Sequence, residues 1–177
     1  LTLYIEKQNT SISNPIIGIN PGASYGSAKR WAPQKFAEVA YSLSRKYDIY
    51  IFGGPNEQDA AIQIENYLLE NGVKNYKNLS GKTTISDLMR YISQLDLFIT
   101  GDSGPMHIAA SFNIPTVSIF GPTKDSETSQ WMNVKNTIIK KTLSCQPCMK
   151  RTCPLGHNNC MELTQPVDVL NAVNYIN

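Results

Sequence analysis

The chain has 177 residues, of which 41% are hydrophobic and 17% are charged, values typical of one globular domain with a substantial core. The formal net charge of +2 is too small to indicate a nucleic-acid partner. No apolar run approaches the roughly 20 residues that cross a bilayer, and the N-terminus lacks the order of a signal peptide. We therefore expect a soluble, cytoplasmic protein that does not bind nucleic acid.

The first residues of the chain differ in character from the rest. Residues 1–14 end in the polar stretch NTSISN, which is typical of a linker rather than of the start of a domain. We expect residues 1–14 to be a linker or the remnant of a missing upstream domain, and residues 15–177 to form the domain itself. Half of an active site would then belong to the missing part.

A buried strand is predicted at Ile16–Asn20, and the loop PGASYGSAKRW follows it. Gly22 and Gly26 let the backbone approach a ligand closely, while Ser24 and Lys29 supply a hydroxyl and a cation. This composition suits a phosphate. The loop matches neither the Walker A pattern nor G-x-G-x-x-G, so an ordinary solvated loop is the alternative.

The next unit is a helix, a strand and a second helix. The first helix begins at Pro33 and ends near Lys46, the strand is Asp48–Phe52, and the second helix is Glu57–Glu70. Ligands of open parallel sheets bind outside the carboxyl ends of the strands, so Glu57 stands where a ribose diol can be held. The alternative is that Glu57 only favours the positive end of its helix.

A weak strand near Tyr76–Leu79 precedes the stretch GKTTISDLMRYISQ. Thr83 or Thr84 is suited to cap a helix over Ile85–Gln94, and the sequence leaves that choice open. The loop before this helix lies at the same edge of the sheet as the earlier loops, so it is a candidate wall for a base.

The stretch LDLFITGDSGPMHIAA, Leu95–Ala110, is the centre of the predicted sheet. Its apolar run predicts a strand buried on both faces that ends at Gly101. Asp102 and Ser103 are N-cap residue types, and a helix follows them. Free backbone N–H groups and the helix dipole favour a phosphate there, and Asp102 offers a carboxylate to sugar hydroxyls. The alternative is an ordinary capped turn.

The letters GDSGP also resemble the nucleophile segment of trypsin-like serine proteases. Those proteins are all-β barrels that need a distant histidine and aspartate, whereas Ser103 here opens a helix and the only histidines are His107 and His157. We therefore disfavour a serine hydrolase. His107 lies in the first turn after Ser103, where it either faces a phosphate or has a structural role.

Another central strand is predicted at Thr116–Phe120, and the turn GPTKDSET after it is rich in hydroxyls. A helix over Val167–Ile176 closes the domain. Strand and helix signals alternate about five times, which predicts an α/β fold with a doubly wound, parallel sheet. The polar turns at the strand ends then converge on one crevice.

All four cysteines lie in the segment CQPCMKRTCPLGHNNC. Cys145 and Cys148 form one C-x-x-C pair, but Cys153 and Cys160 do not form the second tight pair of a zinc ribbon, so the spacing argues against metal. A cytoplasmic location disfavours disulfides. We interpret the cysteines as reduced thiols that shape a lid loop, and the sequence leaves metal binding open.

Four motifs, PGASYGSAKRW, GDSGPMHIAA, FGPT and CMKRTCPLGHNNCM, occur in order from about Pro15 to the last helix. Together they resemble the carboxyl-terminal half of the lipopolysaccharide heptosyltransferases. The resemblance implies the GT-B architecture, in which two Rossmann-like domains face each other. It implies that this chain binds ADP-heptose, while the missing N-terminal domain supplies the catalytic base and the site for the lipid A-core acceptor.

The same resemblance implies roles for individual residues. Lys29 looks like the family lysine that meets the diphosphate, Glu57 like the acid near the ribose, and Asp102 like the carboxylate that holds the heptose. Thr83 matches the position beside the adenine. The diphosphate cradle would be completed by Ser103, Gly104 and His107.

The implied reaction is an inverting transfer of heptose without a metal ion or other cofactor. A lysine and a helix N-terminus can stabilise the charge that gathers on a departing ADP. A peripheral contact with the inner membrane is implied by the lipid-linked acceptor. The alternatives are a non-catalytic nucleotide-binding module and a GT-B-type epimerase, which would prefer UDP to ADP.

Overall fold

The computed structural model describes residues 14–23 and 25–176 of the chain. Its centre is one sheet in which every neighbouring pair of strands is parallel, in the order β3-β2-β1-β4-β5-β6. The order reverses between β1 and β4, which is the topological switch point of a doubly wound fold. The predicted fold class is therefore confirmed. The strands are β1 (Ile16–Asn20), β2 (Asp48–Ile51), β3 (Tyr76–Asn78), β4 (Leu97–Gly101), β5 (Thr116–Ile119) and β6 (Asn136–Ile139).

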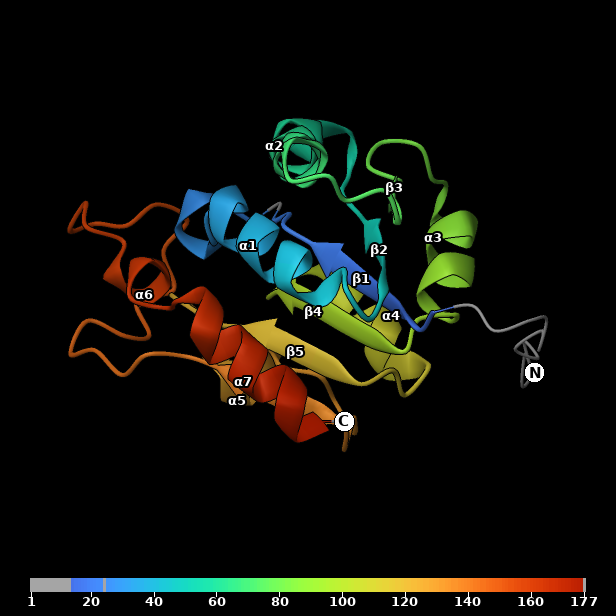
Figure 1. The fold of residues 1–177 in the computed structure, drawn as a ribbon. Coiled ribbons are helices and arrows are strands. Elements are labelled where there is room, and N and C mark those ends of the chain that lie inside the picture. Colours follow the sequence, from blue (N-terminus) through green and yellow to red (C-terminus); the bar gives the residue numbers. More distant parts are fainter. Residues whose placement is uncertain (1–13, 24, 177) are drawn as a thin grey trace.

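Helices cover both faces of this sheet (Figure 1). Helices α1 and α7 cross one face, and α4 lies behind the other. Short helices and 3₁₀ turns occur between them. The helical elements are α1 (Pro33–Leu43), α2 (Gln58–Glu70), α3 (Ile85–Ile92), α4 (Gly104–Ser111), α5 (Asp125–Thr128), α6 (Asn159–Glu162), α7 (Pro166–Ile176), η1 (Ser27–Lys29) and η2 (Pro55–Glu57).

The sheet separates two apolar clusters. The larger one packs against α1, α2 and α7 and includes the edge-to-face pair of Trp31 and Phe36, whose ring centroids are 4.8 Å apart. The smaller one packs against α3 and α4 around Phe52 and Phe98. All five residues of β4 are buried, as expected for a central parallel strand. This rigid sheet fixes the positions of the loops at its carboxyl edge.

Several element boundaries differ from the sequence prediction. The first helix ends at Leu43 rather than near Lys46, and α2 begins at Gln58 because residues 55–57 form a 3₁₀ turn. The sequence assigned no element to β6, an edge strand whose residues are all half-buried and therefore lack a strong apolar signal. None of the helices in the described ranges is long and apolar enough to cross a membrane.

Candidate functional site

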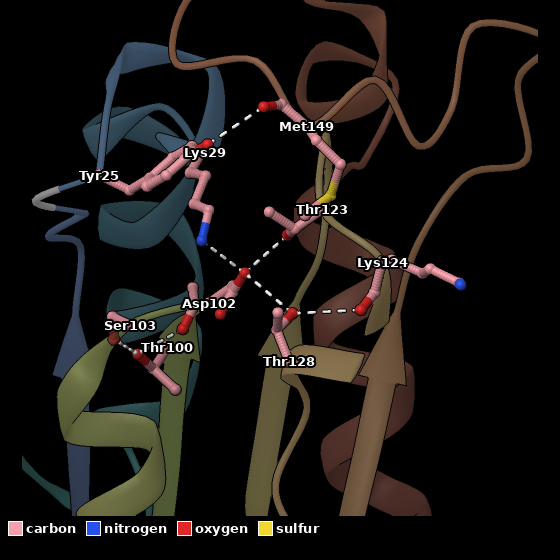
Figure 2. Close-up of polar contacts among 10 residues, drawn as sticks. Tyr25, Lys29, Thr100, Asp102, Ser103, Thr123, Lys124, Thr128 and Met149 are labelled. Atoms are coloured by element: carbon pink, nitrogen blue, oxygen red, sulfur yellow. Dashed lines mark hydrogen bonds and ion pairs between the residues drawn. The ribbon is translucent and has the colours of Figure 1, made fainter. Parts of the chain in front are cut away.

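The site is centred on an ion pair between Lys29 and Asp102, which lie 73 residues apart in the sequence (Figure 2). Lys29 belongs to η1 after β1, and Asp102 follows β4, so the pair bridges the switch point of the sheet. The Lys29 Nζ lies 2.6 Å from Asp102 Oδ2. Only 10% of the lysine side chain and 6% of the aspartate side chain are exposed. Charged groups are buried to this extent almost only when paired, so this ion pair is a candidate for the centre of a functional site.

Two hydroxyls from the segment after β5, one in the loop and one at the end of α5, join the same carboxylate. Thr123 Oγ1 donates to Asp102 Oδ2 at 2.6 Å, and Thr128 Oγ1 donates to it at 3.4 Å. All three contacts reach one oxygen, which leaves Asp102 Oδ1 without a partner among the described residues. Figure 2 shows Lys29, Thr123 and Thr128 converging on Asp102 from three directions.

Tyr25 supports the lysine from the other side. The Lys29 Nζ lies 4.5 Å from the centroid of the Tyr25 ring, close enough for a cation–π interaction. The Tyr25 hydroxyl in turn donates to the backbone carbonyl of Met149 at 3.1 Å (Figure 2). The ammonium group of Lys29 is thus held between a carboxylate and an aromatic face.

A second polar group lies at the switch point, beside the ion pair. Asn20 at the end of β1 donates from Nδ2 to Thr100 Oγ1 and to Ser103 Oγ, each at 3.1 Å. The hydroxyls of Thr100 and Ser103 lie 3.0 Å apart (Figure 2). Ser103 occupies the N-cap position of α4, as its residue type predicts, but its side chain makes no capping hydrogen bond. The helix therefore begins without a side-chain cap.

Glu57 approaches the loop after β1 from η2, which follows β2. Its Oε2 accepts the backbone N–H of Gly54 at 2.8 Å. The carboxylate lies so close to Gly22 that a Cβ at that position would overlap it. Glu57 and the glycine-bearing loop therefore meet at the same edge of the sheet, as predicted, and Gly22 is needed for this close approach.

The other predicted residues take less central places. Thr83 is half-buried and precedes Thr84, which is the actual cap of α3 and accepts the Asp87 N–H at 3.1 Å. Gly104 and His107 lie on the exposed first turn of α4, and a Cβ at Gly104 would meet nothing within 4 Å. Ser24 falls outside the described residues, so its predicted role rests on the sequence alone.

A family model decides the identity of the chain. The model of glycosyltransferase family 9 (heptosyltransferase) matches residues 3–159. The chain belongs to glycosyltransferase family 9. The structure therefore shows the Rossmann-like half of a GT-B fold, as the motifs imply.

Members of family 9 share its sequence over most of its length. It is 49% identical over 156 residues to lipooligosaccharide heptosyltransferase 2 of Campylobacter jejuni subsp. jejuni serotype O:2, a match that covers 88% of this chain and 49% of that relative. It is 30% identical to lipopolysaccharide heptosyltransferase 2 of Escherichia coli K12, over 93% of this chain and 47% of that relative. The solved structure of E. coli ADP-heptose lps heptosyltransferase II superposes with a TM-score of 0.77 at 27% identity, over 95% of this chain and 48% of that one. The chain spans about half the length of these family 9 proteins.

Sequence reasoning missed several partners in this family 9 chain. The sequence indicates Thr123 and Thr128 only as hydroxyls in a polar turn, and no pattern in it singles out Tyr25, Asn20 or Thr100. The signal for the threonines is the turn FGPTKDSET itself, because it follows the strand next to that of Asp102. Tyr25 has no such signal in the sequence, because its ring comes to lie against Lys29 only when the loop between them turns back on itself.

The cysteine segment, residues 145–160, packs against the loop that carries Lys29. The Ala28 N–H donates to the Arg151 carbonyl at 3.0 Å, and a Cβ at Gly26 would overlap the Arg151 backbone. Backbone N–H groups, foremost that of Asn158, hold the pKa of the Cys153 thiol below its usual range. Burial raises the pKa of Cys160. In this family 9 structure, the cysteine segment is a wall behind the lysine loop.

Proposed function

We propose that this chain is the donor-binding half of a heptosyltransferase and that it binds ADP-heptose at the carboxyl edge of its sheet. The complete protein would transfer heptose to the inner core of lipopolysaccharide with inversion and without a metal ion. The catalytic base and the acceptor site would lie in the part of the protein outside this chain. Heptose transfer would take place in the cytoplasm, at the face of the inner membrane, because the acceptor is lipid-linked.

The order of the residues along the sheet carries this proposal. Thr83 follows β3, Glu57 follows β2, Lys29 follows β1 and Asp102 follows β4, and these strands are consecutive neighbours in the sheet. The roles expected for the four residues are adenine, ribose, diphosphate and heptose, which is the order of the groups along an ADP-sugar. Three strand spacings of about 4.8 Å give about 14 Å, a length suited to an extended nucleotide sugar.

The uncapped first turn of α4 supports a phosphate at the middle of this row. A helix N-terminus presents backbone N–H groups and positive dipole charge, and a capping side chain would compete for them. Ser103 bonds to Asn20 instead of capping, whereas Thr84 caps α3 in the ordinary way. Together with Lys29, this turn would stabilise the charge that develops on ADP as the glycosidic bond breaks.

Asp102 would hold the sugar through its remaining oxygen. Its Oδ2 is committed to Lys29, Thr123 and Thr128, whereas a carboxylate oxygen accepts hydrogen bonds from sugar hydroxyls readily. The pairing also keeps the lysine ammonium at the switch point before the donor arrives. A diphosphate then meets a preorganised cation rather than a mobile one.

Nucleotide-selective calorimetry tests the proposal. We expect ADP to bind the chain at least about tenfold more tightly than UDP or GDP. The reason is that the proposed contact with the nucleobase, at Thr83 in the loop after β3, is a contact with adenine. A preference for UDP would favour a UDP-sugar epimerase and contradict the proposal. ADP binding combined with no heptose transfer by the full-length protein would indicate a non-catalytic nucleotide-binding module.

A further inference from the structure

All four cysteines of the chain line one cavity that lies outside the nucleotide row. Its volume is about 20 Å³, enough for a single ion or water molecule and too small for an organic ligand. The cysteines come from two stretches of the segment, residues 145–148 and 153–160, which the fold brings to the same cavity. The lining thiols are those of Cys145, Cys148, Cys153 and Cys160.

Two further residues of the lining carry buried oxygens without partners. Gln146 Oε1 and Asn158 Oδ1 are both enclosed, and neither accepts a hydrogen bond from the described residues. An orphaned buried acceptor is costly and calls for an explanation such as an ion or a water molecule. The residues around the cavity thus carry four sulfur donors, and two of these residues also carry an unpaired buried oxygen.

We propose that this cavity is a binding site for one thiophilic divalent cation, held by the four cysteine sulfurs. Sulfur donors select zinc, or iron in a four-sulfur site, over magnesium and calcium, which require oxygen ligands. Four thiolates around a divalent ion carry a net charge of −2, and Lys150 and Arg151 lie in the same segment to offset it. The spacing C-x₂-C-x₄-C-x₆-C, which argued against metal in the sequence, matters less than the shared cavity.

Binding of the ion would draw the four cysteine sulfurs together, because the ligand set is not preformed. Across residues 14–23 and 25–176, no three histidine, cysteine, aspartate or glutamate side chains are yet gathered closely enough to hold a metal ion. Metal binding commonly completes the folding of its own ligand loop. Here the closing loop is the wall behind Lys29, since Met149 accepts from Tyr25 and Arg151 accepts from Ala28.

Metal content after purification under reducing conditions tests the proposal directly. We expect elemental analysis to find about one metal ion per chain and to identify it as zinc or iron. Cys148→Ser and Cys153→Ser should each lose most of the ion, while Ser144→Ala, a change at the exposed residue just before the segment, should retain it. Replacement by Co²⁺ should give the absorption bands of sulfur-bound cobalt.

A second measurement covers the case in which the cysteine variants fail to fold. Added Zn²⁺ should slow the reaction of the unmodified protein with a thiol reagent, and Mg²⁺ should not. A metal-free protein whose thiols react equally fast with and without Zn²⁺ would overturn the proposal and would assign a water molecule to the cavity. Neither readout depends on nucleotide binding, so the result is independent of the proposed function.

Discussion

Lys29 and Asp102 show how one buried pair can prepare a binding site at the scale of single residues. Burying two charges costs desolvation that their attraction barely offsets, so such a pair contributes little net stability. Its value here lies in position, because it joins the loops after β1 and β4 at 2.6 Å. Removing one partner would leave the other as an uncompensated charge, which costs far more than the pair contributes.

Thr123→Val tests the role of the threonine hydroxyl on Asp102. The change keeps the shape of the side chain and removes its 2.6 Å hydrogen bond to the carboxylate. We expect the free energy of unfolding, measured with urea, to fall by about 2 kcal/mol because the acceptor is charged and buried. Ser126→Ala removes an exposed hydroxyl in the neighbouring helix α5; it is the matched control and should change the free energy of unfolding little. Equal losses of unfolding free energy in both variants would show that the hydrogen bond from Thr123 to Asp102 contributes nothing specific to stability.

Gly22→Ala tests the close approach of the Glu57 carboxylate. The added methyl group would overlap the carboxylate, which is the end of a flexible side chain and can move aside. We therefore expect stability within about 0.5 kcal/mol of the unmodified protein but weaker ADP binding, as in Glu57→Ala. The two changes should not be additive, because both displace the same carboxylate. Additive losses of affinity would place the effect of Gly22 elsewhere.

At the scale of elements, the same strand–turn–helix pattern gives two different helix starts. Thr84 and Asp87 cap α3 reciprocally, as their types and spacing predict. Ser103 has an equally suitable type at the start of α4, yet Asn20 and Thr100 engage its hydroxyl. The sequence predicts the cap position in both cases. It cannot predict which hydroxyl is diverted, because the competing partner, Asn20, lies on a strand 83 residues earlier.

Helix α7 gives a pH-dependent prediction. Asp168 accepts the Gln165 N–H at 2.8 Å and pairs with Lys141 at 2.8 Å, and these contacts hold its pKa below the usual value of 3.8. A lowered pKa in the folded state means that the carboxylate stabilises the protein above the ordinary pKa and loses this effect as pH falls through the folded pKa. We expect Asp168→Asn to lower the free energy of unfolding by about 1 kcal/mol at pH 7.

The check on this prediction is its disappearance in acid. Urea titrations of the unmodified protein and of Asp168→Asn should converge as the pH falls below 3.8 and through the lower pKa of the folded aspartate, where the carboxylate becomes protonated. A difference that is independent of pH would mean that the side chain acts through packing rather than through its charge.

At the scale of the whole molecule, the sequence predicts the doubly wound parallel sheet but not the contacts of the site. The apolar runs of β1, β4 and β5 predict buried parallel strands, and polar turns after them predict a crevice at one edge. The edge strand β6 has no comparable signal. Residue types at the strand ends indicate Lys29, Glu57 and Asp102 as candidates, but the partners of these side chains depend on loop paths that no local pattern encodes.

The gathering of the cysteines in one cavity is a further property of the whole molecule. Their spacing alone argues against a metal, since only one tight pair is present. The fold closes the segment on itself and brings all four thiols to a common space. The spacing of the cysteines in the sequence is therefore a poor guide to metal binding in this chain. The loop folds back and brings Cys153 and Cys160 together without a second C-x-x-C pair.

Calorimetric titration with ADP tests the central claim, that Lys29 is the cation of a donor diphosphate site. Lys29→Gln removes the positive charge while keeping a hydrogen-bond donor for Asp102, and Lys46→Gln makes the same change at an exposed position far from the strand carboxyl ends. We expect Lys29→Gln to weaken ADP binding at least about tenfold and Lys46→Gln to change it less than about twofold. Unchanged ADP affinity in a folded Lys29→Gln protein would contradict the claim.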